Sequence, residues 1–216
     1  VEEIAPEDSE RSGIRRGDRV IVDIACPFGT CRLCRSGDDA NCVHMGVTNG
    51  GDPDEAPYLH GGYARKSFAP VETLIRIPEG LDPVTVCVYA CVGSTVMHNI
   101  ALAEQAGWKP RPDDTAVVQG LGPMGTFAAA YFAALGVRRV IAVTAGRDAQ
   151  REQAAAAVGV SWVLTLEDDI PGEIAALTDG LGADFCLEAS GAPAAFPTGL
   201  SLLRNRGVYM VPGQYS

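Results

Sequence analysis

A chain of 216 residues is long enough for one large domain or two smaller ones, and either can bury a hydrophobic core. Its formal net charge of -10 argues against a general nucleic-acid-binding protein, which needs a basic face. No apolar run reaches the length of a membrane span and the first residues do not resemble a signal peptide, so we expect no membrane partner.

The cysteine content argues against one further class, the disulfide-stabilised proteins. The chain has seven cysteines, an odd number, without a secretory context. This argues against a disulfide scaffold and favours a cytoplasmic protein whose thiols bind a metal or act in catalysis.

Residues 1–85 predict short strands joined by turns, because short apolar runs alternate with Gly, Pro and Asp. The runs DRVIVDIA (18–25) and ETLIRIP (72–78) are the clearest strands. HGGYARKSFAP (60–70) has the form of a turn followed by a strand.

Within this region, Cys31, Cys34 and Cys42 follow a C-x2-C-x7-C spacing that is typical of metal ligands, and Arg32 and Arg35 would favour the thiolate forms. A C-x2-C pair alone could be a redox motif. No thioredoxin-like βαβ pattern lies beside it, so metal binding is the better interpretation.

A helix that is mostly buried is expected over 84–107, and strands alternate with helices after it. This alternation predicts a parallel sheet covered on both faces. The predicted strands are 115–119, 138–143, 161–166, 183–190 and 207–213, and the predicted helices are 123–136, 147–159, 170–180 and 192–205.

The first strand of this series leads into a glycine-rich loop, in which Gly120, Gly122 and Gly125 have the G-x-G-x-x-G spacing. The pattern alone is weak, but here it follows a strand, opens a helix and lies in a βαβ unit, as dinucleotide binding requires. The glycines would allow a tight turn, close approach to a pyrophosphate and helix–strand packing. A plain strand-to-helix turn is the alternative. The loop also contains Leu121, Pro123 and Met124.

The end of the second strand bears on which dinucleotide binds. Thr144 stands where an acidic residue would contact the adenosine ribose, and Arg147 lies close by. A missing carboxylate and a nearby arginine favour NADP over NAD. Two alternatives stay open: Arg147 is only an exposed residue at a helix start, or Asp148 neutralises it or takes over the ribose contact.

Taken together, the cysteine cluster and the glycine loop resemble the zinc-containing medium-chain dehydrogenase/reductase family, the alcohol dehydrogenases and their relatives. The segments GDRVIV, GGYARKSFAP, IPEGL and GLGPMG occur in the family's order. The resemblance implies an α/β protein: a Rossmann doubly wound parallel sheet, preceded by part of a GroES-like β domain with a structural-zinc lobe at about 26–44. The implied domains are 1–85 and 86–216, the second with a leading linker helix and without its last strand.

The resemblance also implies a structural zinc site. Cys31, Cys34 and Cys42 match the second, third and fourth ligands of the family's lobe, but Phe28 occupies the first ligand position. A tetrahedral site wants four ligands. Cys26 is therefore the expected substitute, with His44 as a second candidate, unless the lobe has lost its zinc and keeps three buried thiols.

The remaining site residues rest on the resemblance alone. Cys91 matches the family's third catalytic zinc ligand, and Thr95 matches a residue near the nicotinamide. Segments at two later strand ends match those that line the cofactor: Ala189, Ser190 and Gly191, then Pro212 and Gly213.

Other parts of the family's pattern are not in this sequence. The first two catalytic ligands and the proton-relay hydroxyl belong upstream of Val1, and VEEIAPE (1–7) resembles the strand that follows the second ligand. We therefore expect these residues to be the middle of a longer enzyme, and 216 residues alone not to oxidise alcohols.

The sequence thus predicts a cytoplasmic, zinc-dependent, NAD(P)-linked oxidoreductase that interconverts a small alcohol and an aldehyde or ketone, acting as a homo-oligomer without a nucleic-acid or membrane partner. Two rival hypotheses remain. One is a zinc-independent quinone or enoyl reductase of the same superfamily, and the other is a non-catalytic nucleotide-binding relative.

Overall fold

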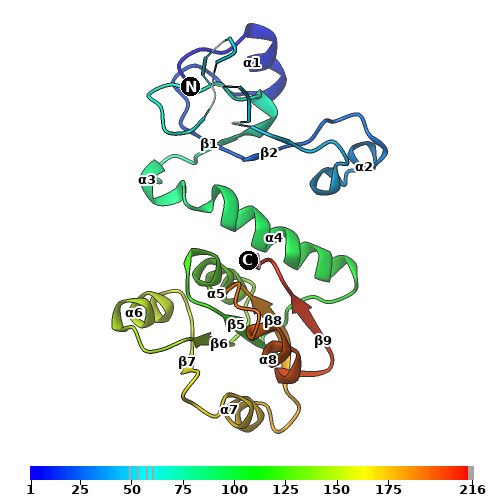
Figure 1. The fold of residues 1–216 in the computed structure, drawn as a ribbon, viewed down its shortest axis with the longest axis vertical. Helices are drawn as coiled ribbons and strands as arrows, with labels where there is room; N and C mark the ends of the chain where they lie inside the picture. The colour runs from blue at the N-terminus through cyan, green and yellow to red at the C-terminus, as the bar shows by residue number, and fades with distance from the viewer. Residues whose placement is uncertain (49, 53, 57, 60, 214–216) are drawn as a thin grey trace. The chain divides into compact units, whose positions relative to one another are not determined.

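The computed structural model describes residues 1–48, 50–52, 54–56, 58–59 and 61–213. Its contacts divide the chain into two compact units, Val1–Cys91 and Val92–Ser216 (Figure 1). The sequence predicts a domain boundary at 85/86, whereas this division falls within helix α4 (Tyr89–Gln105).

The first unit contains short elements joined by turns. β1 pairs antiparallel with β4, and β2 pairs antiparallel with β3. β1 and β4 confirm the strands predicted near residues 20 and 75. The elements are α1 (Pro6–Ser12), β1 (Val20–Val22), β2 (Ala25–Cys26), α2 (Arg32–Arg35), the 3-10 helix η1 (Asp39–Asn41), β3 (Gly46–Val47), the 3-10 helix η2 (Val71–Thr73), β4 (Leu74–Arg76) and α3 (Pro83–Val86).

Two predicted strands are not found in this unit. Residues 1–5 have no strand structure, and helix α1 begins at Pro6, because the fixed φ of proline suits the first position of a helix. In the predicted turn and strand of 60–70, His60 lies outside the described residues. Residues 61–66 form bends, starting at Gly61 with a φ of 95°.

The helix expected over 84–107 is divided and less buried than predicted. α3 ends at Val86 and α4 begins at Tyr89. Only Gly93, Val96, Ile100 and Ala103 of α4 are buried. These residues recur every three or four positions, so one face of the helix packs on the core and the other faces remain accessible.

The second unit is a five-stranded parallel sheet of order β7-β6-β5-β8-β9 (Figure 1). β5 is central, β6 and β7 are added on one side of it, and β8 and β9 are added on the other. This is the strand order of a doubly wound Rossmann sheet, as predicted. The elements are β5 (Thr115–Gln119), α5 (Pro123–Ala134), β6 (Arg139–Thr144), α6 (Ala149–Ala157), β7 (Trp162–Thr165), α7 (Ile170–Leu177), β8 (Ala183–Glu188), α8 (Ala195–Leu202) and β9 (Leu203–Met210).

Both faces of the sheet are covered by helices. Successive residues of a strand point to opposite faces, so neighbouring residues of β5 pack against different helices. Val118 lies in a cluster with residues of α4, α5 and α6, whereas its neighbour Val117 packs with residues of α7 and α8. All five residues of β5 are buried. The sequence also predicts that Gly136 ends α5 with a positive φ, and its φ of 93° confirms this.

The last helix and strand are shifted from their predicted bounds. α8 ends at Leu202 rather than at 205, and β9 runs from Leu203 to Met210 rather than over 207–213. The strand starts early because Leu203 already pairs with Ala183, before an irregularity that contains Arg206 at a φ of 65°. Pro212 and Gly213 therefore follow the strand instead of ending it.

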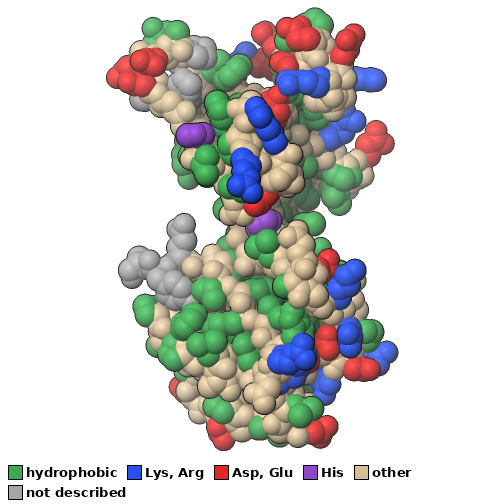
Figure 2. Space-filling view, turned by 90° about the vertical axis from the view of Figure 1, so that its right-hand side faces the viewer, with side chains coloured by type: hydrophobic (Ala, Val, Ile, Leu, Met, Phe, Trp, Pro, Cys, Tyr) green, Lys and Arg blue, Asp and Glu red, His purple; other side chains and the backbone are tan. Residues whose placement is uncertain are grey.

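The surface of the described residues is mixed in charge. On the face drawn in Figure 2, basic side chains lie beside acidic ones and form no single large basic area. Within the part of the chain that the structure describes, no helix combines the length and apolarity needed to cross a membrane.

Candidate functional site

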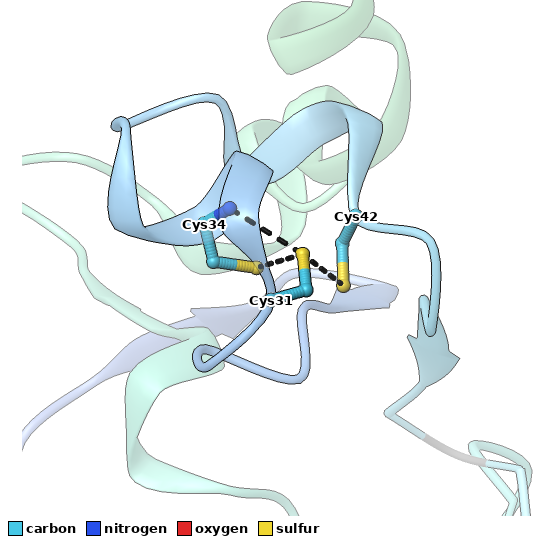
Figure 3. A group of neighbouring side chains, drawn as sticks. All are labelled: Cys31, Cys34 and Cys42. Atoms are coloured by element: carbon cyan, nitrogen blue, oxygen red, sulfur yellow. Dashed lines mark hydrogen bonds between the residues drawn. The ribbon is translucent and has the colours of Figure 1, made fainter.

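The cysteine cluster is built by two short helices of the first unit. Cys31 caps the N-terminus of α2, Cys34 lies within α2, and Cys42 follows η1. Their side chains point toward one another (Figure 3), with Sγ–Sγ distances of 3.4 Å from Cys31 to Cys34 and 4.0 Å from Cys31 to Cys42. The three sulfur atoms lie within 4.8 Å of one another.

Backbone N–H groups point at two of these sulfurs. The Cys34 N–H lies 3.5 Å from Cys31 Sγ, and the Phe28 N–H donates to Cys42 Sγ at 3.3 Å. Donation from the Cys34 backbone, followed by that from Val43, lowers the pKa of Cys31 to about 7, whereas burial raises the pKa of Cys34 to about 11. The leading cause of the lowered pKa of Cys31 is thus a backbone donor rather than Arg32 or Arg35.

This donor set fits a thiophilic divalent ion such as zinc, because three convergent thiols can supply most of a tetrahedral shell. Cys26 ends strand β2, opposite Gly46, and is not in the group of three. His44 contacts the Phe28 ring, with the ring centroids 5.6 Å apart. Phe28 reaches the cluster through its backbone N–H, a role that the sequence did not reveal.

The glycine loop has the shape that a pyrophosphate requires. Gly120 has a φ of 95°, and a Cβ on Gly125 would overlap the Gly120 carbonyl oxygen. Gly122 caps α5 with a φ of -75°, and a Cβ there would meet no atom within 4 Å. Open space at a helix N-terminus, bounded by backbone, suits a phosphate group.

The other residues of the loop hold it against the core. Leu121 is 5% exposed and belongs to the buried cluster on the α5 face of the sheet, and Met124 packs against that cluster. Pro123 occupies the first turn of α5, where its missing N–H costs no hydrogen bond. These contacts fix the loop at the carboxyl end of β5.

One later segment meets this loop, and a second segment packs on the first. The Ala189 N–H donates to the Gln119 carbonyl at 2.9 Å, and a Cβ on Gly120 would lie 3.0 Å from the Ser190 nitrogen. The Gly213 N–H donates to the Glu188 carbonyl at 3.2 Å. The structure therefore brings the predicted segments 189–191 and 212–213 to the same edge of the sheet.

A small cavity of about 80 Å³ lies between the glycine loop and the end of β6. In dinucleotide-binding sheets the adenosine ribose occupies this region. The lining residues are Leu121, Thr144, Ala145, Gly146, Asp148, Arg151 and Glu152.

Arg147 is not among the lining residues. Its guanidinium lies 3.6 Å from Glu152 and 3.6 Å from Asp168, and donates to the Val163 carbonyl at 3.1 Å. Arg151 lines the cavity instead and pairs with Asp148 at 3.3 Å. Arg151 was not predicted from the sequence. Its position in the first turn of the helix that follows Thr144 was the available signal.

Cys91 and Thr95 lie four residues apart on α4, so they share one face of that helix. Cys91 is exposed and Thr95 is half-buried, and the Thr95 carbonyl accepts a hydrogen bond from the Asn99 side chain at 2.9 Å. Among the described residues, the candidate metal group consists of the cysteine cluster and does not include Cys91.

Two family profiles match the chain in succession. Residues 1–79 match the alcohol dehydrogenase GroES-like domain, and residues 123–215 match the zinc-binding dehydrogenase family. Together they cover the unit with the cysteine cluster and most of the parallel sheet.

The individual relatives that match the chain are named as dehydrogenases. A probable alcohol dehydrogenase of Mycobacterium tuberculosis is 32% identical over 218 residues, covering 97% of this chain and 58% of the relative. A sorbitol dehydrogenase of Halalkalibacterium halodurans is 34% identical, covering 95% of this chain and 56% of the relative. The crystal structure of an alcohol dehydrogenase from Thermotoga maritima superposes with a TM-score of 0.81 at 28% identity, covering 92% of this chain and 55% of that one. The chain thus spans somewhat more than half the length of these relatives.

Proposed function

This chain belongs to the zinc-dependent alcohol dehydrogenase-like family of medium-chain dehydrogenases, and from that premise we propose that the protein is a zinc-dependent, NAD(P)-linked oxidoreductase that interconverts an alcohol and an aldehyde or ketone. The observation that carries the proposal is the glycine loop, which joins a buried central strand to a helix and leaves open space at Gly122.

When bound, a nicotinamide dinucleotide would supply the hydride acceptor or donor for the carbinol carbon, and zinc would supply a Lewis acid for the substrate oxygen. The chain's own contribution begins with the loop. Gly120 and Gly125 let the backbone turn tightly, and the N–H groups at the start of α5 would face the phosphates of a bound dinucleotide. The proposed further cofactor contacts are Leu121, Pro123, Met124, Ala189, Ser190, Gly191, Pro212 and Gly213.

Two zinc roles are proposed for the thiols. Cys31, Cys34 and Cys42 would hold a structural ion, because their sulfurs converge, and Cys26 is the proposed fourth ligand. Cys91 would be a ligand of the catalytic zinc, with Thr95 on the same helix face next to the nicotinamide.

The finer proposal for the cofactor is NADP. Thr144 offers a hydroxyl instead of a repelling carboxylate at the cavity, and Arg151 lines it. Arg147 lies close by but shares its charge with Glu152 and Asp168. Asp148 opposes this preference, since its carboxylate is also at the cavity.

The substrate is proposed to be a small alcohol or its carbonyl product, and the protein is proposed to act as a cytoplasmic homo-oligomer. Seven cysteines without a secretory context support a reducing compartment.

A turnover assay tests the proposal. The protein at its full natural length is incubated with NAD or NADP and a panel of alcohols that includes sorbitol, and the reduced nicotinamide is followed by its absorbance, before and after zinc removal by a chelator. We expect turnover that is lost on chelation and restored by zinc. Turnover with quinones or enoyl substrates that resists chelation would instead identify a zinc-independent reductase, and dinucleotide binding without any turnover would identify a non-catalytic relative.

A further inference from the structure

Glu188 is a fully buried carboxylate at the carboxyl end of β8, with 0% of its surface exposed. Its Oε1 accepts hydrogen bonds from the N–H of Ser190 at 2.6 Å and the N–H of Gly191 at 3.0 Å, and also from the Ser190 hydroxyl. A buried carboxylate is costly unless such donors surround it. The side chain therefore fixes the conformation of the turn at 189–191.

This turn lies directly against the glycine loop. A Cβ added to Gly120 would come within 3.0 Å of the Ser190 nitrogen and 3.2 Å of the Ala189 carbonyl carbon. The Ala189 N–H also donates to the Gln119 carbonyl at 2.9 Å. With so little free space between the two backbones, a displaced turn would displace Gly120 as well.

A third segment packs on the same carboxylate. The Gly213 N–H donates to the backbone carbonyl of Glu188. A Cβ on Gly213 would collide with Oε2 of the Glu188 side chain and lie 3.3 Å from the Gly191 nitrogen. Glu188 thus touches both the turn at 189–191 and the segment 212–213, and reaches the glycine loop through the turn.

We propose that Glu188 is a positioning residue for the dinucleotide: its carboxylate holds the three segments that face the cofactor in their binding arrangement. This rests on the cofactor binding proposed above and adds a residue that neither the glycine motif nor the zinc chemistry identifies. Glu188 itself does not need to touch the dinucleotide, because it acts through the backbone of Ser190, Gly191 and Gly213.

Asp184, at the opposite end of β8, provides a matched control. It is also a largely buried carboxylate, with 16% of its side chain exposed. Its Oδ2 accepts the Thr115 N–H at 2.8 Å and its Oδ1 pairs with Arg204 at 2.5 Å. Asp184→Asn should therefore lower stability without changing the dinucleotide site.

Dinucleotide affinity is measured by calorimetric titration, and folding by thermal unfolding, for the wild type, Glu188→Ala, Glu188→Gln, Ser190→Ala and Asp184→Asn. We expect Glu188→Ala to bind about tenfold or more weakly, as the loss of hydrogen bonds to a charged group predicts. Glu188→Gln keeps an acceptor oxygen and should restore most of the affinity. Asp184→Asn should bind like the wild type. Amide exchange at Ser190 and Gly191 should accelerate in Glu188→Ala even without dinucleotide.

Ser190→Ala removes one donor and should weaken binding by roughly threefold to tenfold. Because Ser190 is itself a proposed cofactor contact, faster amide exchange at Gly191 in this variant without dinucleotide is the supporting result if Glu188→Ala does not fold. The positioning role is overturned if a folded Glu188→Ala binds like the wild type, or if Asp184→Asn binds as weakly as Glu188→Ala. If Glu188→Ala does not fold, wild-type affinity in Ser190→Ala overturns it. A wild type that binds neither dinucleotide would overturn the proposed function together with this inference.

Discussion

Gly122 and Gly125 belong to one loop but differ in the room around them. A Cβ on Gly122 meets no atom within 4 Å, and its φ of -75° suits any residue. A Cβ on Gly125 would overlap the Gly120 carbonyl oxygen. We expect Gly122→Ala to fold normally but to bind dinucleotide at least about tenfold more weakly, because the methyl group takes space needed by the pyrophosphate. Unfolding in urea and calorimetric titration give the two quantities.

Gly125→Ala is the matched comparison. Here the loss should appear in stability, by about 1–3 kcal/mol, because an overpacked site forces the backbone to shift. Equal stability losses in both variants, or unchanged dinucleotide affinity in Gly122→Ala, would contradict the assignment of the open space to the cofactor.

Substitutions of Arg147 and Arg151 test which of the two arginines would contact the 2′-phosphate of NADP. Arg151 lines the cavity next to Thr144, while Arg147 faces Glu152 and Asp168. A charge-assisted contact with a 2′-phosphate is worth on the order of 1.5–3 kcal/mol. We therefore expect Arg151→Ala to lower NADP affinity roughly tenfold or more and leave NAD affinity almost unchanged. Arg147→Ala should have the smaller effect, because Arg147 does not line the cavity.

Binding of both dinucleotides to the two variants and to the wild type is measured at one salt concentration. A wild type that binds NAD more tightly, with a ratio that neither substitution changes, would show that the preference for NADP is wrong.

At the scale of elements, α2, η1 and the turns around them bring the cysteine cluster together. We expect the protein to bind one zinc ion there, and Cys34→Ser or Cys42→Ser to lose it, because each removes a thiolate from a site with three convergent sulfurs. Zinc content is measured by elemental analysis. Cys87→Ser is the control, since this exposed thiol donates to the Val84 carbonyl and is outside the cluster.

Cys26→Ser tests the fourth ligand. If Cys26 completes the shell, its loss should weaken zinc binding and reduce the thiolate-to-metal absorption of the cobalt-substituted protein. An unchanged cobalt spectrum would leave the fourth position to His44 or water. Wild-type protein free of zinc after preparation with zinc present would contradict the whole site.

The elements that the sequence predicted best are those whose residues are buried on both faces. β5 and β8 each contain three consecutive apolar residues in a strand that is almost entirely buried, which is typical of central parallel strands. The start of β9 was missed, because Leu203 joins the sheet through its pairing with Ala183, a long-range contact that no local pattern encodes. α1 was missed for a different reason: none of its residues is buried, so it has no apolar periodicity to read.

In the candidate site, too, contacts between residues close in the sequence were predicted, and contacts between distant residues were not. The spacing of Cys31, Cys34 and Cys42 predicted their convergence, because the ligands are close in the sequence. The contacts of Phe28 with Cys42 and of Glu188 with Gly213 depend on how distant loops fold back. Sequence spacing contains no information about such contacts.

Considered as a whole, the chain keeps its two kinds of candidate chemistry in different units. The cysteine cluster lies within Val1–Cys91, whereas the glycine loop and the turn at 189–191 lie within Val92–Ser216. Dinucleotide binding and structural-metal binding can therefore be measured separately. The proposed alcohol oxidation would need a metal ligand outside the cysteine cluster, and α4 contributes the candidate, Cys91.

Cys91→Ala tests this assignment in the assay of alcohol oxidation. Lewis-acid stabilisation by a metal is worth several kcal/mol, and each 1.36 kcal/mol corresponds to a factor of ten in rate. We therefore expect kcat to fall about a hundredfold or more. Dinucleotide affinity should stay at the wild-type value, since the glycine loop and the cavity beside it do not involve Cys91. Cys87→Ser, four residues earlier in the chain, should retain full activity. If Cys91→Ala keeps wild-type turnover while the enzyme remains sensitive to chelation, the catalytic ion is held by other residues and Cys91 has no part in the reaction.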